Sequence, residues 1–159
     1  MLANLPRPLL RLLHHASHLW FRLARPLTMG VRAVVLDEAG RVCLVRHSYL
    51  PGWHLPGGGV EVGETVLEAL ARELREEGHI ELTGAPVLHG VYLNTFVTRR
   101  DHVLIYVVRD FRQTHPRGGD YEIVETGFFP ADGMPQATAR SSRARIDEVL
   151  GGAPASALW

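Results

Sequence analysis

The stretch GGGVEVGETVLEALARELREEGHIEL, residues 57–82, carries the strongest local pattern of the chain. Seven of the seventeen acidic residues lie in these 26 positions, directly after a run of glycines. Thr65 followed three residues later by Glu68 is a capping box, which predicts a helix over 65–78. Helical spacing then predicts an apolar stripe that faces the core, formed by Leu67, Leu70, Ala71 and Leu74.

The acidic residues of this helix are sorted by the same spacing. At about 100° per residue, Glu73, Glu76 and Glu77 share one face, whereas Glu68 points to solvent. Like charges four residues apart on an exposed helix cost only about 0.2–0.5 kcal/mol a pair. In a partly enclosed site, the repulsion approaches about 3 kcal/mol a pair. Three glutamates alone are therefore typical of a solvated face, and in a cleft they need a cation.

The glycine run before the helix favours the cleft. In LPGGG, residues 55–59, successive glycines let the backbone approach a ligand and turn amide or carbonyl groups toward it. Oxygen ligands at this density suit a hard cation, Mg²⁺ or Mn²⁺. The stretch therefore predicts a divalent metal site.

Residues 58–80 resemble the signature box of the Nudix hydrolases. That box is a glycine, five residues, Glu, seven residues, then Arg-Glu-apolar-x-Glu-Glu-x-Gly-apolar. Eight of its nine fixed positions match here: Gly58, Glu64, Arg72, Glu73, Leu74, Glu76, Glu77 and Ile80. The ninth is occupied by His79, and Gly78 lies one place early. We expect a changed helix exit, with His79 in a left-handed conformation or Gly78 ending a shorter helix.

The resemblance implies a fold, a reaction and a cofactor. The fold is α/β (α+β), a Nudix-like α/β/α sandwich with a mixed β-sheet. The reaction is hydrolysis of a nucleoside diphosphate linked to another moiety, with Mg²⁺ or Mn²⁺ as cofactor. The metal ligands that it implies are a carbonyl at Gly57 and the carboxylates of Glu73, Glu76 and Glu77.

The remaining site residues follow from the same resemblance and from their position in the chain. Glu73 is also the candidate base, and Arg72 would orient the carboxylates. A remote acid often completes such sites, and Glu122 is the candidate, with Glu125 as the alternative. Arg46, at the end of its predicted strand, and Gly58 are the candidates for binding substrate.

The rest of the chain supports a mixed sheet with helices on its faces. Two strands are expected within 29–47, joined at Asp37–Gly40, and a second pair at 87–96 and 102–111. A further strand is expected at 121–129 and a closing helix at 136–150. This order lacks regular βαβ alternation. The predicted organisation is an N-terminal segment 1–28, a domain 29–150, and a tail 151–159 that we expect to be poorly ordered.

Residues 5–27 predict an additional amphipathic helix outside the resemblance. The first 36 residues contain five arginines and no acidic residue, so this helix would be basic. A signal peptide fits poorly, because His and Arg interrupt its apolar core. Three roles stay open: packing on its own domain, contact with a second subunit in a homodimer, or peripheral contact with an anionic membrane.

Composition limits the class of protein. A chain of 159 residues with 46% hydrophobic and 21% charged residues is typical of one soluble domain. No apolar run is long enough to predict a membrane-spanning helix. Cys43 is the single cysteine, which excludes a disulfide framework and favours a cytoplasmic protein. Within VCLV, Cys43 is expected to be a buried apolar residue.

Two classes of function follow from these observations. The first is a metal-dependent hydrolase acting on a nucleoside diphosphate derivative, with no specific nucleic-acid partner. The second is a non-catalytic Nudix-like module that senses a nucleotide metabolite. Since every glutamate of the box is present, the sequence favours the hydrolase. No second motif selects a particular nucleotide.

Overall fold

The computed structural model describes residue 20 and residues 26–96, 98–114 and 123–159. The predicted N-terminal helix over 5–27 lies outside the described residues, apart from Trp20, Pro26 and Leu27. Glu122, the candidate remote acid, also lies outside them.

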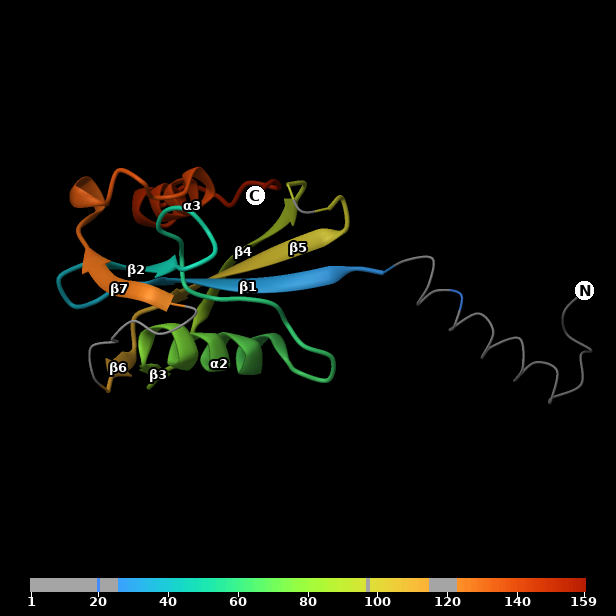
Figure 1. Ribbon diagram of the computed structural model, residues 1–159, viewed down its shortest axis with the longest axis horizontal. Helices are drawn as coiled ribbons and strands as arrows, with labels where there is room; N and C mark the ends of the chain where they lie inside the picture. Colours follow the sequence, from blue (N-terminus) through green and yellow to red (C-terminus); the bar gives the residue numbers. More distant parts are fainter. Residues whose placement is uncertain (1–19, 21–25, 97, 115–122) are drawn as a thin grey trace, which may run out of the picture.

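The described residues form three layers, in which a mixed sheet lies between two helices. Strand β5 (Asp101–Val108) is central, pairing in parallel with β1 (Thr28–Val35) and antiparallel with β4 (Val87–Asn94). Helix α2 (Val66–Gly78) covers one face of this sheet and α3 (Arg140–Gly151) covers the other (Figure 1). This arrangement confirms the predicted α/β sandwich with a mixed sheet.

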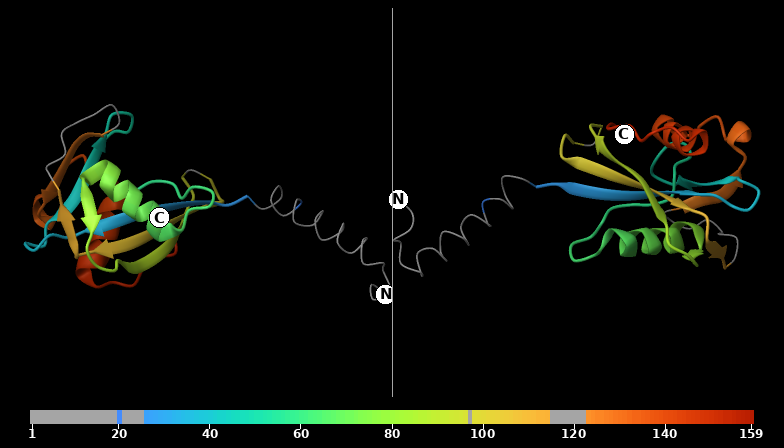
Figure 2. Two further views of the ribbon diagram at one scale, coloured as in Figure 1. Left: turned by 90° about the horizontal axis from the view of Figure 1, so that it is seen from below. Right: turned by 180° about the vertical axis from the view of Figure 1, so that it is seen from behind.

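Two smaller sheets complete the fold. Strand β2 (Val42–His47) pairs antiparallel with β7 (Ile123–Phe129). Strand β3 (Ile80–Leu82) pairs antiparallel with β6 (Phe111–Gln113), and both lie at the C-terminal end of α2 (Figure 2). The predicted strand over 102–111 included Arg109 and Asp110, which separate β5 from β6 in the structure.

The closing helix begins later than predicted. A 3-10 turn, η1 (Ala131–Gly133), precedes it, and α3 starts at residue 140 rather than 136. The intervening backbone is engaged elsewhere: Trp53 N–H donates to the Ala137 carbonyl at 3.0 Å, and Ala139 N–H donates to the Trp53 carbonyl at 2.9 Å. The segment before α3 therefore makes a turn at residues 136–137 and packs beside the loop that contains Trp53.

Alternation along the central strands builds one core on each side of the sheet. Residues of β1 and β5 that face α2 contact its buried side chains, and the residues between them face α3. The α2 side contains Val31, Ala33, Val35, Leu104, Tyr106 and Val108, whereas the α3 side contains Val34, Leu36, Val103 and Ile105. Strands covered on both faces explain why the sequence showed no clean polar alternation there.

Cys43 is fully buried in the core on the α2 side. Burial raises the pKa of its thiol to about 12, with the nearby Glu77 carboxylate as a smaller cause. Cys43 is therefore the apolar core residue that the sequence predicted.

The capping box starts α2 as predicted. Thr65 Oγ1 accepts from Glu68 N–H at 3.2 Å, and the Glu68 carboxylate accepts from Thr65 N–H at 2.8 Å. The predicted apolar stripe was wrong at Leu67, which is 50% exposed. The face that packs against the sheet contains Ala69 in place of Leu67. It also includes Leu70, Leu74 and Glu77.

The helix exit resolves the one mismatch with the Nudix box. His79 itself adopts the left-handed conformation, with φ 52° and ψ 35°, and α2 runs through Gly78. The His79 N–H donates to the Arg75 carbonyl at 3.1 Å, and the His79 carbonyl accepts from Thr114 N–H at 3.0 Å. A histidine therefore takes the place and the conformation of the usual glycine, at a cost of about 1–2 kcal/mol in backbone strain.

His79→Gly should stabilise the protein by about 1 kcal/mol, because glycine adopts a left-handed backbone without that strain. Urea unfolding measures the difference. His79→Ala is the matched control, since it keeps the β-carbon and removes only the imidazole. A His79→Gly protein no more stable than the His79→Ala protein would show that the backbone at this position is not strained.

The segment after α3 contradicts the predicted disordered tail. Leu93 N–H donates to the Ala157 carbonyl at 2.9 Å, and Trp159 N–H donates to the Leu93 carbonyl at 3.1 Å. Residues 157–159 thus extend beside β4, in a parallel bridge between Leu93 and Leu158. Glycine and alanine in this segment hid the signal, because the pairing uses backbone groups.

No helix among the described residues is long and apolar enough to cross a membrane.

Candidate active site

The loop of residues 55–59, called the glycine loop below, contacts helix α2 through two glycines. Gly57 N–H donates to Glu77 Oε2 at 2.7 Å, and Glu77 is only 5% exposed. At Gly58, an added β-carbon would overlap the Glu73 carboxylate, so only glycine lets this carboxylate lie so close to the loop. The loop and two of the predicted ligands are therefore held together.

Arg72 connects the loop to three carboxylates. Its guanidinium donates two hydrogen bonds to the Glu64 carboxylate, at 2.9 and 3.0 Å, and one to Glu73 Oε1 at 2.7 Å. It also lies 3.4 Å from Glu76 Oε2 and donates to the Gly59 carbonyl at 3.1 Å. The orienting role that the resemblance implies for Arg72 would act through these contacts.

The charges of this cluster reinforce one another. The hydrogen bond from Arg72 holds the pKa of the Glu64 carboxyl below its usual value, so Glu64 stays ionised. In return, the hydrogen bonds to Glu64 and Glu73 raise the pKa of the Arg72 guanidinium. The planar guanidinium forms a bidentate pair that an ammonium group cannot reproduce.

Arg72→Lys should lower kcat about 10- to 100-fold, because lysine keeps the charge but loses the bidentate hydrogen bonds to Glu64. Steady-state kinetics at saturating Mg²⁺ measures the loss. Arg75→Lys on the same helix is the matched control and should leave kcat unchanged. Wild-type turnover by the Arg72→Lys protein would exclude an orienting role.

Glu77 has a second buried neighbour that the sequence did not reveal. His47 Nε2, at the end of β2, lies 3.5 Å from Glu77 Oε1, and both side chains are buried. The backbone carbonyl of Glu77 accepts from Thr126 Oγ1 at 2.8 Å. These contacts join α2 to the β2–β7 sheet and fix the direction of the Glu77 carboxylate toward the loop.

The donor set fits a hard divalent cation. Glu73, Glu76 and Glu77 offer carboxylate oxygens, and the glycine loop offers carbonyl oxygens next to them. Among the described residues, no three acidic, His or Cys side chains lie close enough to hold an ion as they stand. Glu76, with a side chain 59% exposed, has room to move toward the other two.

A cavity of about 610 Å³ adjoins the glycine loop on the face of the sheet that carries α3. Strands β1, β4 and β5, the loop before α2, the start of α3 and Trp159 all contribute to its wall. Gly58 lines this cavity and also lies against the Glu73 carboxylate. Gly58 therefore connects the cavity to the Glu73 carboxylate, although Glu73, Glu76 and Glu77 are not among the residues that line the cavity.

Arg32 is a residue of this site that was not predicted. It lines the cavity and donates to the Leu55 carbonyl at 3.2 Å and to the Gly57 carbonyl. Because a carbonyl oxygen has two lone pairs, the Gly57 carbonyl can accept a second partner beside Arg32. Its sequence signal was a charged residue at an inward position of an otherwise apolar strand, between Val31 and Ala33.

Arg46, a candidate for binding substrate, has an acidic neighbour in the structure. Arg46 pairs across the β2–β7 ladder with Glu125, at 2.9 Å between Nη2 and Oε2. Its guanidinium carbon lies 5.8 Å from the centre of the Trp53 ring. Arg46 is not among the residues that line the cavity, so binding a substrate there would require it to leave Glu125.

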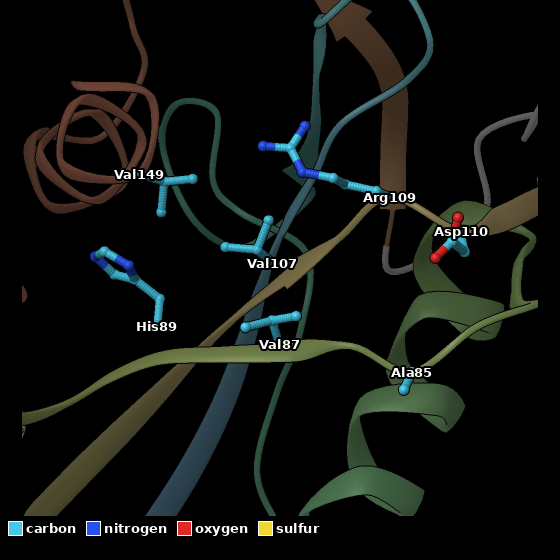
Figure 3. A pocket seen from close by; sticks show the side chains of 7 residues that line it. All are labelled: Ala85, Val87, His89, Val107, Arg109, Asp110 and Val149. Carbon is cyan, nitrogen blue, oxygen red and sulfur yellow. The ribbon is translucent and has the colours of Figure 1, made fainter. Parts of the chain in front are cut away.

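A second cavity, of about 300 Å³, lies at the other end of the same sheet face (Figure 3). Val87, Val107 and Val149 form an apolar part of its wall, and His89 and Arg109 provide polar groups. None of the predicted site residues that the structure describes lines it. Of these two cavities, the larger is the one that a predicted site residue, Gly58, lines.

Comparison with known proteins gives the family. The model of the NUDIX domain matches residues 26–149, which is most of the chain. The chain belongs to the NUDIX family. The MutT NUDIX hydrolase of Burkholderia pseudomallei has a similar structure, with a TM-score of 0.66 and 26% sequence identity. That match covers 77% of this chain and 97% of the other, and the fold of this NUDIX domain is thus the family fold.

Curated relatives share a shorter segment with this NUDIX chain. A putative 8-oxo-dGTP diphosphatase of Bacillus subtilis is 44% identical over 50 residues, which is 31% of this chain and 34% of that protein. An RNA pyrophosphohydrolase of Halorhodospira halophila is 51% identical over 48 residues, or 30% of this chain and 26% of that protein. The chain thus matches about a third or less of each relative's length.

Proposed function

We propose that this NUDIX protein is a divalent-metal-dependent hydrolase of a diphosphate linkage in a nucleotide-derived substrate. One observation carries the proposal: Gly58 lines a cavity of about 610 Å³ and lies against the Glu73 carboxylate. A ligand in the cavity therefore reaches the acidic cluster across one glycine. The glutamates would repel a bound diphosphate unless a cation lay between them. A cation shared by the glutamates and the diphosphate would remove this repulsion.

Mg²⁺ or Mn²⁺, held by Glu76, Glu77 and the Gly57 carbonyl, would neutralise the diphosphate, polarise a P–O bond and lower the pKa of a bound water. Glu73 accepts a proton from the attacking water or completes the ligand set. The water oxygen bonds to phosphorus, the bridging P–O bond breaks, and the leaving phosphate keeps the electron pair. Arg72 holds Glu73 and Glu64 in place during this step.

Two further residues of the proposed site lie apart in the sequence from the glutamates of α2 and Arg72. Glu122 would complete the site as a remote acid, and Arg46 would bind a substrate phosphate after release from Glu125. Gly58 would contact the substrate through its backbone, since no side chain stands between it and the cavity.

A substrate screen tests the proposal. Purified protein with Mg²⁺ is incubated with dinucleotides, nucleotide sugars, nucleoside triphosphates including 8-oxo-dGTP, and RNA with a 5′ polyphosphate. The last two are included because the relatives are named for such substrates. Phosphate released directly or after phosphatase treatment is measured, with a chelator control. Hydrolysis that requires the metal supports the hydrolase.

The alternative is a NUDIX module that binds a nucleotide metabolite without turnover. Metal and nucleotide binding with no hydrolysis of any compound in the screen would favour this module over the hydrolase. The presence of Glu73, Glu76 and Glu77 around the glycine loop supports the hydrolase, because a sensor has no need to retain a repulsive cluster.

Contacts of residues 5–27 with an anionic membrane or with a second subunit stay proposals. Sedimentation with anionic vesicles should decrease as salt rises if the membrane contact is electrostatic. A dimer that persists in the absence of vesicles would instead favour the subunit contact.

A further inference from the structure

The wall of the larger cavity includes a residue from beyond the family match. The NUDIX match ends at residue 149, whereas Trp159 lines the cavity. Two backbone hydrogen bonds between Leu93 and residues 157 and 159 hold this segment beside β4. Trp159 therefore adds to the cavity a surface that the family match does not account for.

A buried arginine fixes the position of Trp159. Arg145 Nη1 donates to the Leu158 carbonyl at 2.9 Å, and its Nη2 donates to Glu148 Oε1 at 2.6 Å. The guanidinium carbon lies 4.3 Å from the Tyr92 ring centre and 5.8 Å from that of Trp159. The two rings meet edge to face at 6.0 Å. A buried cation needs such partners, and here they hold the indole in one place.

The same cavity combines aromatic surface with a buried polar pair. Phe96, in the turn after β4, is 85% exposed and also lines the cavity. Asn94 Nδ2 donates to Asp101 Oδ2 at 2.8 Å, and Thr28 Oγ1 donates to Asp101 Oδ1 at 2.7 Å. Stacking surfaces together with edge hydrogen-bonding groups are the chemistry that recognises a nucleobase.

We propose that Trp159 is a specificity-determining residue that stacks on the base of a nucleotide bound in the larger cavity. The base lies toward Trp159 and the Asn94–Asp101 pair, and the phosphates lie toward Gly58. The inference rests on the proposed function, since it takes a nucleotide as the substrate. It goes further by assigning base recognition to a segment outside the family match.

Binding of products tests this without turnover. Calorimetry with Mg²⁺ compares AMP, GMP, CMP and UMP with ribose 5-phosphate, which lacks a base. Wild-type protein should bind at least one nucleotide more tightly than ribose 5-phosphate. Trp159→Ala should weaken that nucleotide about 10- to 100-fold, as expected for loss of one stacking contact, and leave ribose 5-phosphate unchanged.

Two further variants separate stacking from structure. Trp159→Phe keeps an aromatic ring against Tyr92 and should retain most of the nucleotide affinity. Leu158→Ala changes an exposed neighbour that contributes to the segment through its backbone, and should bind like wild type. Equal loss of nucleotide and ribose 5-phosphate binding in Trp159→Ala would show a merely structural role and overturn the inference.

Other results separate this inference from the proposed function. Wild-type protein with no preference for nucleotides over ribose 5-phosphate, or a Trp159→Ala protein with unchanged nucleotide affinity, would overturn the inference even if the enzyme hydrolyses its substrate. Nucleotide binding that depends on Trp159, in a protein that hydrolyses nothing in the screen, would support the inference and overturn the hydrolase.

Discussion

Replacing Glu77 with glutamine is expected to lower kcat about 10³-fold while the protein stays folded. An ion that polarises a phosphoryl oxygen supplies several kcal/mol of transition-state stabilisation, and each 1.36 kcal/mol is about tenfold in rate. Glutamine keeps an oxygen that can accept the Gly57 N–H, now at 2.7 Å from Glu77 Oε2. The loop therefore stays in place, and the loss reports the missing ligand charge.

Glu68→Gln is the matched control, because it makes the same chemical change on the same helix. Glu68 caps the helix at Thr65 and faces solvent, away from the glycine loop. Its turnover should equal that of wild type. Thermal unfolding should show that both variants are folded. A Glu77→Gln protein with near wild-type kcat would remove Glu77 from the metal site.

Gly57→Ala is expected to destabilise the protein by about 3 kcal/mol and to lower kcat about 100-fold. Gly57 has a φ of 134°, a conformation that residues with a side chain rarely adopt. An added β-carbon would also overlap the Val31 carbonyl and lie 2.8 Å from Arg32 Cα. The loop must move, so the Gly57 amide leaves Glu77 and its carbonyl leaves the metal site. Urea unfolding and steady-state kinetics measure the two effects.

Gly63→Ala is the control for backbone strain alone. Gly63 also has a positive φ, of 90°, but an added β-carbon there would meet nothing within 4 Å. It should cost about 1 kcal/mol and leave kcat near wild type. If Gly57→Ala behaved like Gly63→Ala, close packing of the loop on β1 would not matter for the site.

The glycine loop and helix α2 could be predicted from the sequence because their signals are local. A capping box, helical spacing and the box residues all lie within 26 consecutive positions. The structure brings Gly58 against Glu73 and Gly57 against Glu77, contacts that follow once the helix and the loop are known. The predicted phase of the helix was wrong at Leu67, because packing against the sheet decides which face is buried.

The parts that the sequence did not predict depend on contacts between distant residues. Arg32 reaches the loop carbonyls from β1, and His47 reaches Glu77 from β2, yet neither residue stands out in its mostly apolar strand. The pairing of residues 157–159 with β4 uses backbone groups, which leave no side-chain pattern. Such contacts appear only when the strands have been placed in space.

The central claim is that carboxylates at the glycine loop and α2 share a divalent ion. Titration with Mn²⁺, with free Mn²⁺ followed by electron paramagnetic resonance, tests it without any substrate. Wild type and Glu68→Gln should bind Mn²⁺ alike, whereas Glu77→Gln should bind it about 100-fold more weakly, because a charged oxygen ligand is lost. Equal Mn²⁺ binding by all three proteins would contradict the claim.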